Sequence, residues 1–448
     1  MTLTADDLKS TLITLANIPA QREASLGYLP AILFTKWAAD KADEPGFLDR
    51  LAVTEKPVYK TDENPKELVS QALRDPTTYP ATLEELGAGI DDIRDIHHHF
   101  EVLKHTIRTL SLFKIGDMAD EEVLKAFDAY LTKMMKLART GAYCFQPYAA
   151  EIIGRLAGKV SEAYDPFCKT GDLLCAVDAD TRIGSEPNPA VRTIAEVRSR
   201  FCGKRIDTAE DPISSPLTNA DGTLKTFPLV VANIDHLMGP RHREKNPAVS
   251  MDVHGRFTLS PTDWMDDAVM LLHALATTAD TGRCFILSPA MLQGGFRSLR
   301  PAAAAQLHAN DWLEAVIRIP GSKNLLHSPT GISRDLQLHL FNKNKDAERK
   351  GKILFIDAGD TASEEEIDKI CETVAGYKEI PGYAKIVPLE EIIKSRPCDL
   401  NPKCWTTILE QRNAFDKEAV RKEIIQLEGK RLAVLTEILD ILEELKTE

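Results

Sequence analysis

The chain has 448 residues, of which 43% are apolar and 27% are charged, and its formal net charge is −13. This length allows two or three domains with sizeable cores, and the acidic balance argues against a protein that binds duplex DNA alone through a broad basic surface. The eight cysteines form no CxxC pair, which argues against a zinc ribbon or a thioredoxin-like site and predicts free thiols in a cytoplasmic protein. We expect no signal peptide and no membrane segment, because no apolar run reaches roughly 18 residues.

Residues 1–140 predict a helical N-terminal domain. Apolar residues recur near a helical period in three segments, 26–43, 83–113 and 120–138. The histidine triplet at 97–99, with His105 nearby, lacks the ligand spacing of a metal site, because adjacent residues on a helix face different directions. We therefore predict no metal site.

From residue 141 to 400, short apolar or β-branched runs alternate with helical patterns. The expected strands are SEAYDPF, TRIGSEP, FPLVVAN, RCFILSP, LEAVIRIP, LQLHLFNK and KILFIDAG. The expected helices between them include 148–158, 188–201 and 265–279. This alternation predicts a Rossmann-like α/β domain with a mostly parallel, doubly wound sheet, in which a ligand lies at the carboxyl ends of the strands.

Residues 401–448 predict a C-terminal helical tail. Its apolar stripe has members spaced by seven residues with companions between them, namely Ile425, Leu432, Leu435, Leu439 and Leu442. The stripe would pack either on a partner protein or on the chain's own domain, and the sequence leaves both alternatives open.

Three motifs follow predicted strands in chain order. The stretch YDPFCKTGDLLCAV (164–177) places an acid, a proline and a small-residue turn before an apolar helix start. IGSEPNP (183–189) carries Glu186 about twenty residues later, where an acid typically accepts ribose hydroxyls. FPLVVANIDHL (227–237) runs directly into Asn233. Together they predict a site for an adenosine-containing cofactor.

These motifs resemble those of the modification (M) subunits of type I restriction–modification systems, which are adenine-specific DNA methyltransferases dependent on S-adenosylmethionine. The family's loop DP-x-C-G-T/S-G-G-x-L is similar to residues 165–174, and its G-x-E-x-N-P to residues 184–189. Its F-D-x-V-x-A-N-P-P-F is similar to residues 227–236, and Gln146-Pro147 falls where the family has Thr-Pro. The similarity extends over most of the chain.

The resemblance implies roles for residues at the matching positions. It implies that Asn233 accepts a hydrogen bond from the amine of a flipped adenine, that His236 stacks on the base, and that Asp235 stands in the same motif. Asp211 would contact the adenine of the cofactor, although capping of its own loop explains it equally well. The implied cofactor-binding residues are Gln146, Pro147, Asp165, Pro166, Cys168, Lys169, Thr170, Gly171, Glu186 and Asp211.

The resemblance also implies partners. Double-stranded DNA would be recognised within a complex, through a specificity-type subunit held by the C-terminal helix, in a homo- or hetero-oligomer. Four basic residues after Asn233 would meet DNA phosphates or would form a solvated charge run, and these alternatives carry equal weight. They are Arg241, Arg243, Lys245 and Arg256.

Two motifs depart from the family pattern. Lys169 and Asp172 stand in place of glycines, and Ile234 and Asp235 stand in place of prolines. The sequence therefore leaves two functions open. One is an adenine-specific DNA methyltransferase subunit, and the other is an inactive pseudo-methyltransferase with weak or lost S-adenosylmethionine binding that acts as a DNA- or subunit-binding scaffold.

Overall fold

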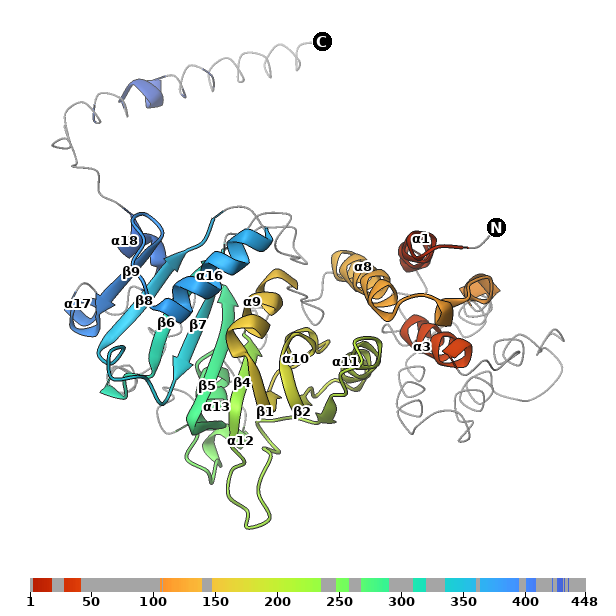
Figure 1. The fold of residues 1–448 in the computed structure, drawn as a ribbon, viewed down its shortest axis with the longest axis horizontal. Helices are drawn as coiled ribbons and strands as arrows, with labels where there is room; N and C mark the ends of the chain where they lie inside the picture. The colour runs from red at the N-terminus through yellow and green to blue at the C-terminus, as the bar shows by residue number, and fades with distance from the viewer. Residues whose placement is uncertain are drawn as a thin grey trace, which may run out of the picture. The chain divides into compact units, whose positions relative to one another are not determined.

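The computed structural model describes residues 3–17, 28–41, 105–106, 108–138, 147–234, 247–257, 267–289, 309–319, 335–359, 363–394 and 400–407, and in the tail 421, 425–429, 431 and 434. The chain divides into two compact units, Met1–Thr406 and Thr407–Glu448. Within the described ranges, no helix is long and apolar enough to cross a membrane, and six cysteines are free thiols. Figure 1 shows the chain coloured from its N-terminus to its C-terminus.

The N-terminal region is helical in its described parts, as predicted. Its elements are α1 (Ala5–Ala16), α3 (Tyr28–Lys41), the 3-10 turn η2 (Ile115–Asp117) and α8 (Asp120–Ala138). Helix α1 begins at a capping box, in which Thr4 and Asp7 satisfy each other's backbone N–H groups. The Trp37 indole Nε1 donates to Asp120 Oδ1 at 3.0 Å, which ties α3 to the start of α8.

Nine strands form one sheet in the part of the chain that the structure describes. They are β1 (Lys159–Asp165), β2 (Asp178–Ser185), β3 (Asp207–Ala209), β4 (Phe227–Asn233), β5 (Thr278–Pro289), β6 (Leu313–Ile319), β7 (Leu336–Asn342), β8 (Lys352–Asp357) and β9 (Ala384–Pro388). Their spatial order is β3-β2-β1-β4-β5-β7-β6-β8-β9. All seven predicted runs are strands, so the predicted α/β fold class is confirmed.

The sheet is parallel from β3 to β5, but β7 runs antiparallel to both β5 and β6. Strand β9 is likewise antiparallel to β8. The sequence of β7 alternates apolar and polar residues from Leu336 to Leu340, as antiparallel strands often do, but its polar residues Gln337 and His339 are also buried because both faces of the sheet are covered.

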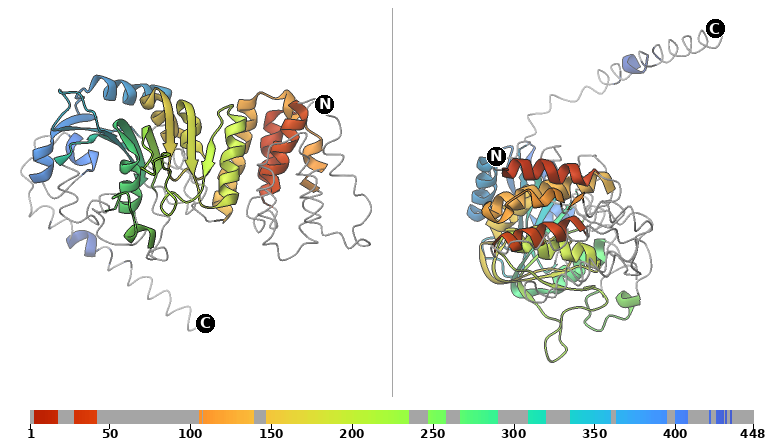
Figure 2. Two further views of the ribbon diagram at one scale, coloured as in Figure 1. Left: turned by 90° about the horizontal axis from the view of Figure 1, so that it is seen from below. Right: turned by 90° about the vertical axis from the view of Figure 1, so that its right-hand side faces the viewer.

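Helices cover both faces of the sheet. One face packs on α9 (Pro147–Ala157), α10 (Asp172–Ala176) and α16 (Glu364–Gly376). The other packs on α12 (Pro247–Ser250), α13 (Asp267–Ala276) and α17 (Leu389–Lys394). Figure 2 shows α9 and α16 on one side of the sheet and α13 on the other. Along β4, Leu229 and Val231 face the first layer, and Val230 and Ala232 face the second.

Helix α11 (Pro189–Phe201) belongs to two regions at once. Four of its apolar residues lie in the same core as α1, α3 and α8, namely Val191, Ile194, Val197 and Phe201. The opposite residue, Ala195, lies in the core of the sheet. The predicted boundary near residue 140 therefore does not separate two compact units.

The predicted start of the tail at residue 401 requires a correction. Helix α18 (Pro402–Thr406) belongs to the first unit, because the ring of Trp405 stacks on Phe355 of β8 with their centroids 5.7 Å apart. The second unit begins at Thr407.

Candidate functional site

The strand order reverses its direction of growth at β1, whose neighbours are β2 on one side and β4 on the other. In open α/β sheets, this switch point leaves a crevice at the carboxyl ends of the strands, where ligands bind. Asp165 ends β1, Glu186 follows β2 directly, and Asn233 ends β4. The fold therefore brings the three predicted motifs to the ends of three adjacent parallel strands.

The loop after β1, residues 166–171, is held by its own hydrogen bonds. Asp165 is 1% exposed, and its Oδ1 accepts a hydrogen bond from the N–H of Phe167 at 2.9 Å. The N–H of Cys168 donates to Ser185 O of β2 at 3.0 Å, and the N–H of Gly171 donates to Cys168 O at 2.7 Å. The loop is thus a defined turn tied to the neighbouring strand.

Glycine is required next to this loop. At Gly184 in β2, a Cβ atom would lie 2.7 Å from the Sγ of Cys168, too close for any side chain. This contact explains why position 184, two residues before Glu186, is a glycine. The loop packs directly on the strand at this point. Gly171 is the N-cap residue of α10. Its φ of 76° lies in the left-handed region, which glycine adopts freely.

Lys169 also lies in the left-handed region, with a φ of 48°. A side chain at such a φ costs roughly 1 kcal/mol or more relative to glycine. The Lys169 ammonium nitrogen is buried, and its charge acts on the carboxyls of both Asp165 and Glu186. A positive charge therefore already lies among the acids that a cofactor at this crevice would meet.

Burial raises the pKa of Asp165 and of Glu186 above their ordinary values. Backbone N–H groups and the Lys169 ammonium oppose this rise at both carboxyls. One oxygen of Glu186, Oε1, accepts a hydrogen bond from the N–H of Asn188 at 2.9 Å. The Glu186 N–H donates to Ala209 O of β3 at 3.0 Å, which fixes the position of its backbone.

Asn233 is 4% exposed at the end of β4 and pairs with Leu287 of β5. The next residue, Ile234, donates its N–H to Leu287 O at 2.8 Å. Proline has no N–H and could not form this bond. The isoleucine at the position of the family's first proline therefore supplies one hydrogen bond of the Asn233–Leu287 pair, an effect that the sequence did not reveal.

Some predicted site residues lie outside the described residues. These are Gln146, Asp235, His236, Arg241, Arg243 and Lys245, together with the His97–His99 triplet. Pro147 begins α9 and lines a cavity beside the loop, while Pro166, Cys168 and Thr170 are buried within the loop.

Asp211 caps its own loop. Its Oδ1 accepts from the N–H of Ile213 at 2.9 Å, and its Oδ2 accepts from Ser214 Oγ at 2.6 Å. Of the two alternatives for this residue, the structure provides direct contacts for the capping role.

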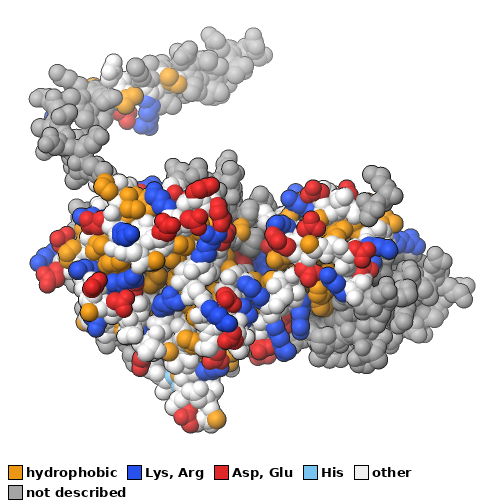
Figure 3. Space-filling model, in the orientation of Figure 1, with side chains coloured by type: hydrophobic (Ala, Val, Ile, Leu, Met, Phe, Trp, Pro, Cys, Tyr) orange, Lys and Arg blue, Asp and Glu red, His pale blue; other side chains and the backbone are white. Residues whose placement is uncertain are grey.

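The expectation that Arg256 meets DNA phosphates requires a correction. Its side chain is 2% exposed and forms an ion pair with Asp252 at 2.7 Å. The guanidinium also donates to the carbonyl oxygens of Pro212 and Ile213 at 3.0 and 2.9 Å. The N–H groups of Arg256 are therefore bonded inside the protein. The side chain holds the segment after α12 in place and does not reach solvent. On the face shown in Figure 3, Lys and Arg side chains are interspersed with Asp and Glu.

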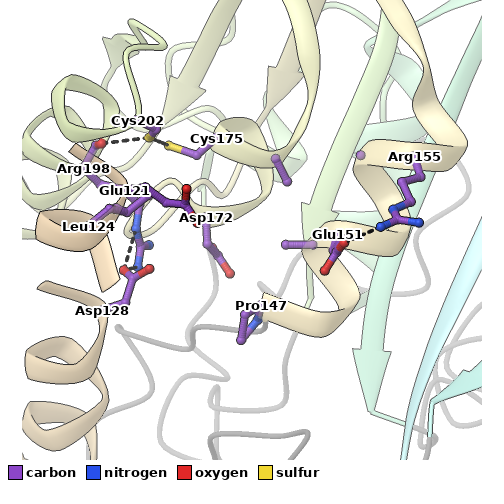
Figure 4. Close-up of a pocket in the computed structure, with 13 residues that line it drawn as sticks. Glu121, Leu124, Asp128, Pro147, Glu151, Arg155, Asp172, Cys175, Arg198 and Cys202 are labelled. Carbon is purple, nitrogen blue, oxygen red and sulfur yellow. Dashed lines mark hydrogen bonds and ion pairs between the residues drawn. The ribbon is translucent and has the colours of Figure 1, made fainter. Parts of the chain in front are cut away.

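A cavity of about 650 Å³ lies beside the loop after β1, between α8, α9, α10 and α11. Figure 4 shows the side chains around it, including Asp128, Asp172 and Arg198. The sequence reading did not single out Arg198. Its spacing from Val191 and Ile194 places it on the apolar face of α11, and this could have indicated a buried charge. A charged residue at a buried helical position needs partners.

The doubly wound sheet, the loop after β1 and the acid after β2 define the class of the domain, a Rossmann-like methyltransferase. Residues 141–413 match the N-6 DNA Methylase family, and the chain belongs to that family.

Two curated relatives from Methanocaldococcus jannaschii are methylase subunits of type I restriction enzymes. The chain is 24% identical to the MjaVIII subunit over 385 residues, covering 76% of this chain and 64% of the relative. It is 33% identical to the MjaVII subunit over 147 residues, covering 30% of this chain and 24% of the relative. The chain thus aligns with less than two thirds of the length of each.

Solved structures share the fold. The methyltransferase subunit of a type I restriction–modification system from Streptococcus thermophilus superposes with a TM-score of 0.65 at 16% identity, covering 90% of this chain and all of that one. A modification subunit of a putative type I restriction enzyme from Vibrio vulnificus gives 0.54 at 12% identity, covering 88% and 94%. The resemblance to type I modification subunits, made from the motifs, is confirmed.

Proposed function

We propose that this chain is the modification subunit of a type I-like DNA methyltransferase complex that uses S-adenosylmethionine and acts on adenine in double-stranded DNA in the cytoplasm. The observation that supports this most directly is the placement of Asp165, Glu186 and Asn233 at the ends of adjacent parallel strands at the switch point.

The residues at the crevice fit a cationic, adenosine-containing cofactor. Two buried carboxyls, Asp165 and Glu186, lie at the crevice. The Lys169 ammonium acts on both of them, and the Arg192 guanidinium acts on Glu186. Asp165 and the loop backbone would hold the methionine end, and the Glu186 carboxylate would accept a ribose hydroxyl. Because Lys169 partly neutralises the site, we expect weaker binding than a glycine at this position would allow.

Bound S-adenosylmethionine supplies an electrophilic methyl group. The contribution of this chain is then to orient the adenine amine toward that methyl group. The side-chain oxygen of Asn233, held by the pairing of β4 with β5, would accept a hydrogen from the exocyclic amine of adenine and direct its lone pair toward the methyl group. Burial of Asn233 keeps water from competing for this hydrogen bond.

The alternative is a pseudo-methyltransferase scaffold that binds DNA or another subunit without turnover. The bond from the Ile234 N–H to Leu287 O favours this alternative, because it ties the backbone immediately after Asn233 to β5, a bond that proline could not form. Lys169 favours it as well, through its charge in the crevice.

Calorimetric titration with S-adenosylmethionine separates these functions. We expect weak but measurable binding to the isolated chain, with transfer of radiolabelled methyl groups to DNA only in the complete complex. Lys169→Gly should bind more tightly. A chain and complex that bind no cofactor, even with glycine at position 169, would leave only the scaffold.

The C-terminal tail is the proposed contact for a specificity-type subunit. Its described residues expose large apolar side chains, with Ile425 at 64%, Leu427 at 59% and Val434 at 54%. The remaining residues of the predicted stripe, Leu432, Leu435, Leu439 and Leu442, lie outside the described residues. Deletion of residues beyond 420 should abolish the complex on a sizing column, whereas an unchanged complex would rule out this contact.

A further inference from the structure

Arg198 lies on α11, between the helical region and the cofactor loop. It is 1% exposed and is the largest of the fully buried side chains in the described ranges. Burial of a guanidinium is costly unless its donors are paired, so its partners indicate what holds it there.

The partners of Arg198 come from two different regions. One terminal nitrogen, Nη1, donates to both the backbone O and the side-chain Oγ1 of Thr170 in the cofactor loop, each at 2.9 Å. The Nε donates to Oδ1 of Asp128 on α8 at 3.1 Å, and Nη2 donates to the same oxygen. Figure 4 shows this connection between Asp128 and Arg198. One side chain therefore joins the loop to a helix of the N-terminal region.

Asp172 completes a cluster of charges around Arg198. It is 6% exposed at the start of α10 and lines the same cavity. Burial alone would lower the pKa of Arg198, but the carboxylates of Asp128 and Asp172 outweigh it and raise that pKa. The guanidinium therefore stays charged. The acid that replaces a family glycine at position 172 thus contributes to the charge balance of this cluster.

We propose that Arg198 is a positioning residue of the cofactor site, which holds Thr170 in place and, through Asp128, makes the N-terminal helical region part of that site. The proposal rests on the proposed function only in identifying the loop as the cofactor site. A displacement of α8 would be transmitted to the loop through this side chain, because the guanidinium binds Asp128 at one end and Thr170 at the other.

Hydrogen–deuterium exchange on the full chain without cofactor tests the connection. In Arg198→Met, the loop amides of Cys168 and Gly171, which are hydrogen-bonded in the native turn, should exchange about tenfold faster or more. Amides of α13, remote from the cluster, should keep their native rates. Arg198→Lys should recover part of the protection, because a single ammonium keeps the charge but cannot bridge both partners.

Matched variants separate positioning from general destabilisation. Asp128→Asn should accelerate exchange in the loop without touching it directly. The control is Arg349→Met, which removes a partly buried guanidinium bound to Glu314 and to Ala375 O on other elements. That variant should leave loop exchange unchanged. Native loop exchange in folded Arg198→Met and Asp128→Asn would overturn the proposal.

A second variant tests the proposal if Arg198→Met does not fold. Thr170→Val removes only the hydroxyl acceptor of Arg198. Native loop exchange in both Thr170→Val and Asp128→Asn would overturn the proposal. Titration with S-adenosylmethionine should show about tenfold weaker binding to Arg198→Lys or Arg198→Met. If the wild-type chain binds no cofactor while loop exchange still responds to Arg198, the proposed function loses its cofactor and the positioning role stands.

Discussion

The loop after β1 and the end of β4 both depart from the family pattern, but in different physical ways. In the loop and at the start of α10, the departures are charged residues that lie near charges of opposite sign. Lys169 lies near Asp165 and Glu186. Asp172 lies near Arg198. At the end of β4, the departure at Ile234 adds a backbone hydrogen bond to β5. Under the proposed function, the first kind of change would act on binding of the charged cofactor, and the second would act on the geometry at Asn233.

The largest effect is expected from Asn233→Ala. Loss of the oriented acceptor should reduce methyl transfer by the complete complex by about 100-fold or more, as for other preorganised polar groups. Affinity for S-adenosylmethionine should stay within about twofold, because the proposed partner of Asn233 is the adenine amine and not the cofactor. The measurement is transfer of radiolabelled methyl groups to DNA. Undiminished transfer would show that another group orients the amine.

Lys169→Gly should raise affinity for S-adenosylmethionine by about tenfold, since it removes a positive charge from the crevice and relieves a left-handed φ. The control is Lys169→Met, which removes the charge and keeps the backbone strain. Titration calorimetry on both variants separates the two causes. Equal affinity in all three chains would show that the ammonium does not oppose the cofactor.

Ile234→Pro should break the bond to Leu287 O and destabilise the fold by about 1 kcal/mol. Affinity for the cofactor should not change, while methyl transfer should increase, because the backbone after Asn233 would no longer be held to Leu287. Ile234→Val keeps the N–H and serves as the control in thermal unfolding and in the transfer assay. If Ile234→Pro changed the affinity for S-adenosylmethionine but not the rate of methyl transfer, the end of β4 would act on binding and not on the geometry of the reaction.

The smallest effect is a dependence of cofactor affinity on pH. The pKa of Glu186 is raised above its ordinary value of 4.5, chiefly by burial. The ionised carboxylate favours a cationic ligand, so affinity should fall as the pH is lowered through this raised pKa. Fold stability should change the opposite way, because the folded state retains the proton more strongly than the unfolded chain. Calorimetry between pH 5 and 8 measures the dependence, and Glu186→Gln should reduce it to the part due to Asp165, whose pKa is also raised by burial.

Much of the site could be predicted from the sequence because it consists of residues that directly follow strands. Apolar runs identified the strands, and their order placed Asp165, Glu186 and Asn233 at one edge of the sheet. Arg256 was assigned to the surface by its charge and by its position after a basic run. Its true surroundings, Asp252 and two carbonyl oxygens of a distant loop, arise only when that loop folds against it.

The sequence by itself determined the class of fold, the order of the cofactor and catalytic motifs and their resemblance to modification subunits, because hydrophobic periodicity and local turns are encoded in neighbouring residues. The tertiary structure decided the antiparallel insertion of β7, the packing of α18 on β8 and the ties between Arg198, Thr170 and Asp128. These features join residues far apart in the chain, up to 70 positions between Asp128 and Arg198. Contacts of this kind depend on how whole elements pack, and no local pattern of residues specifies them.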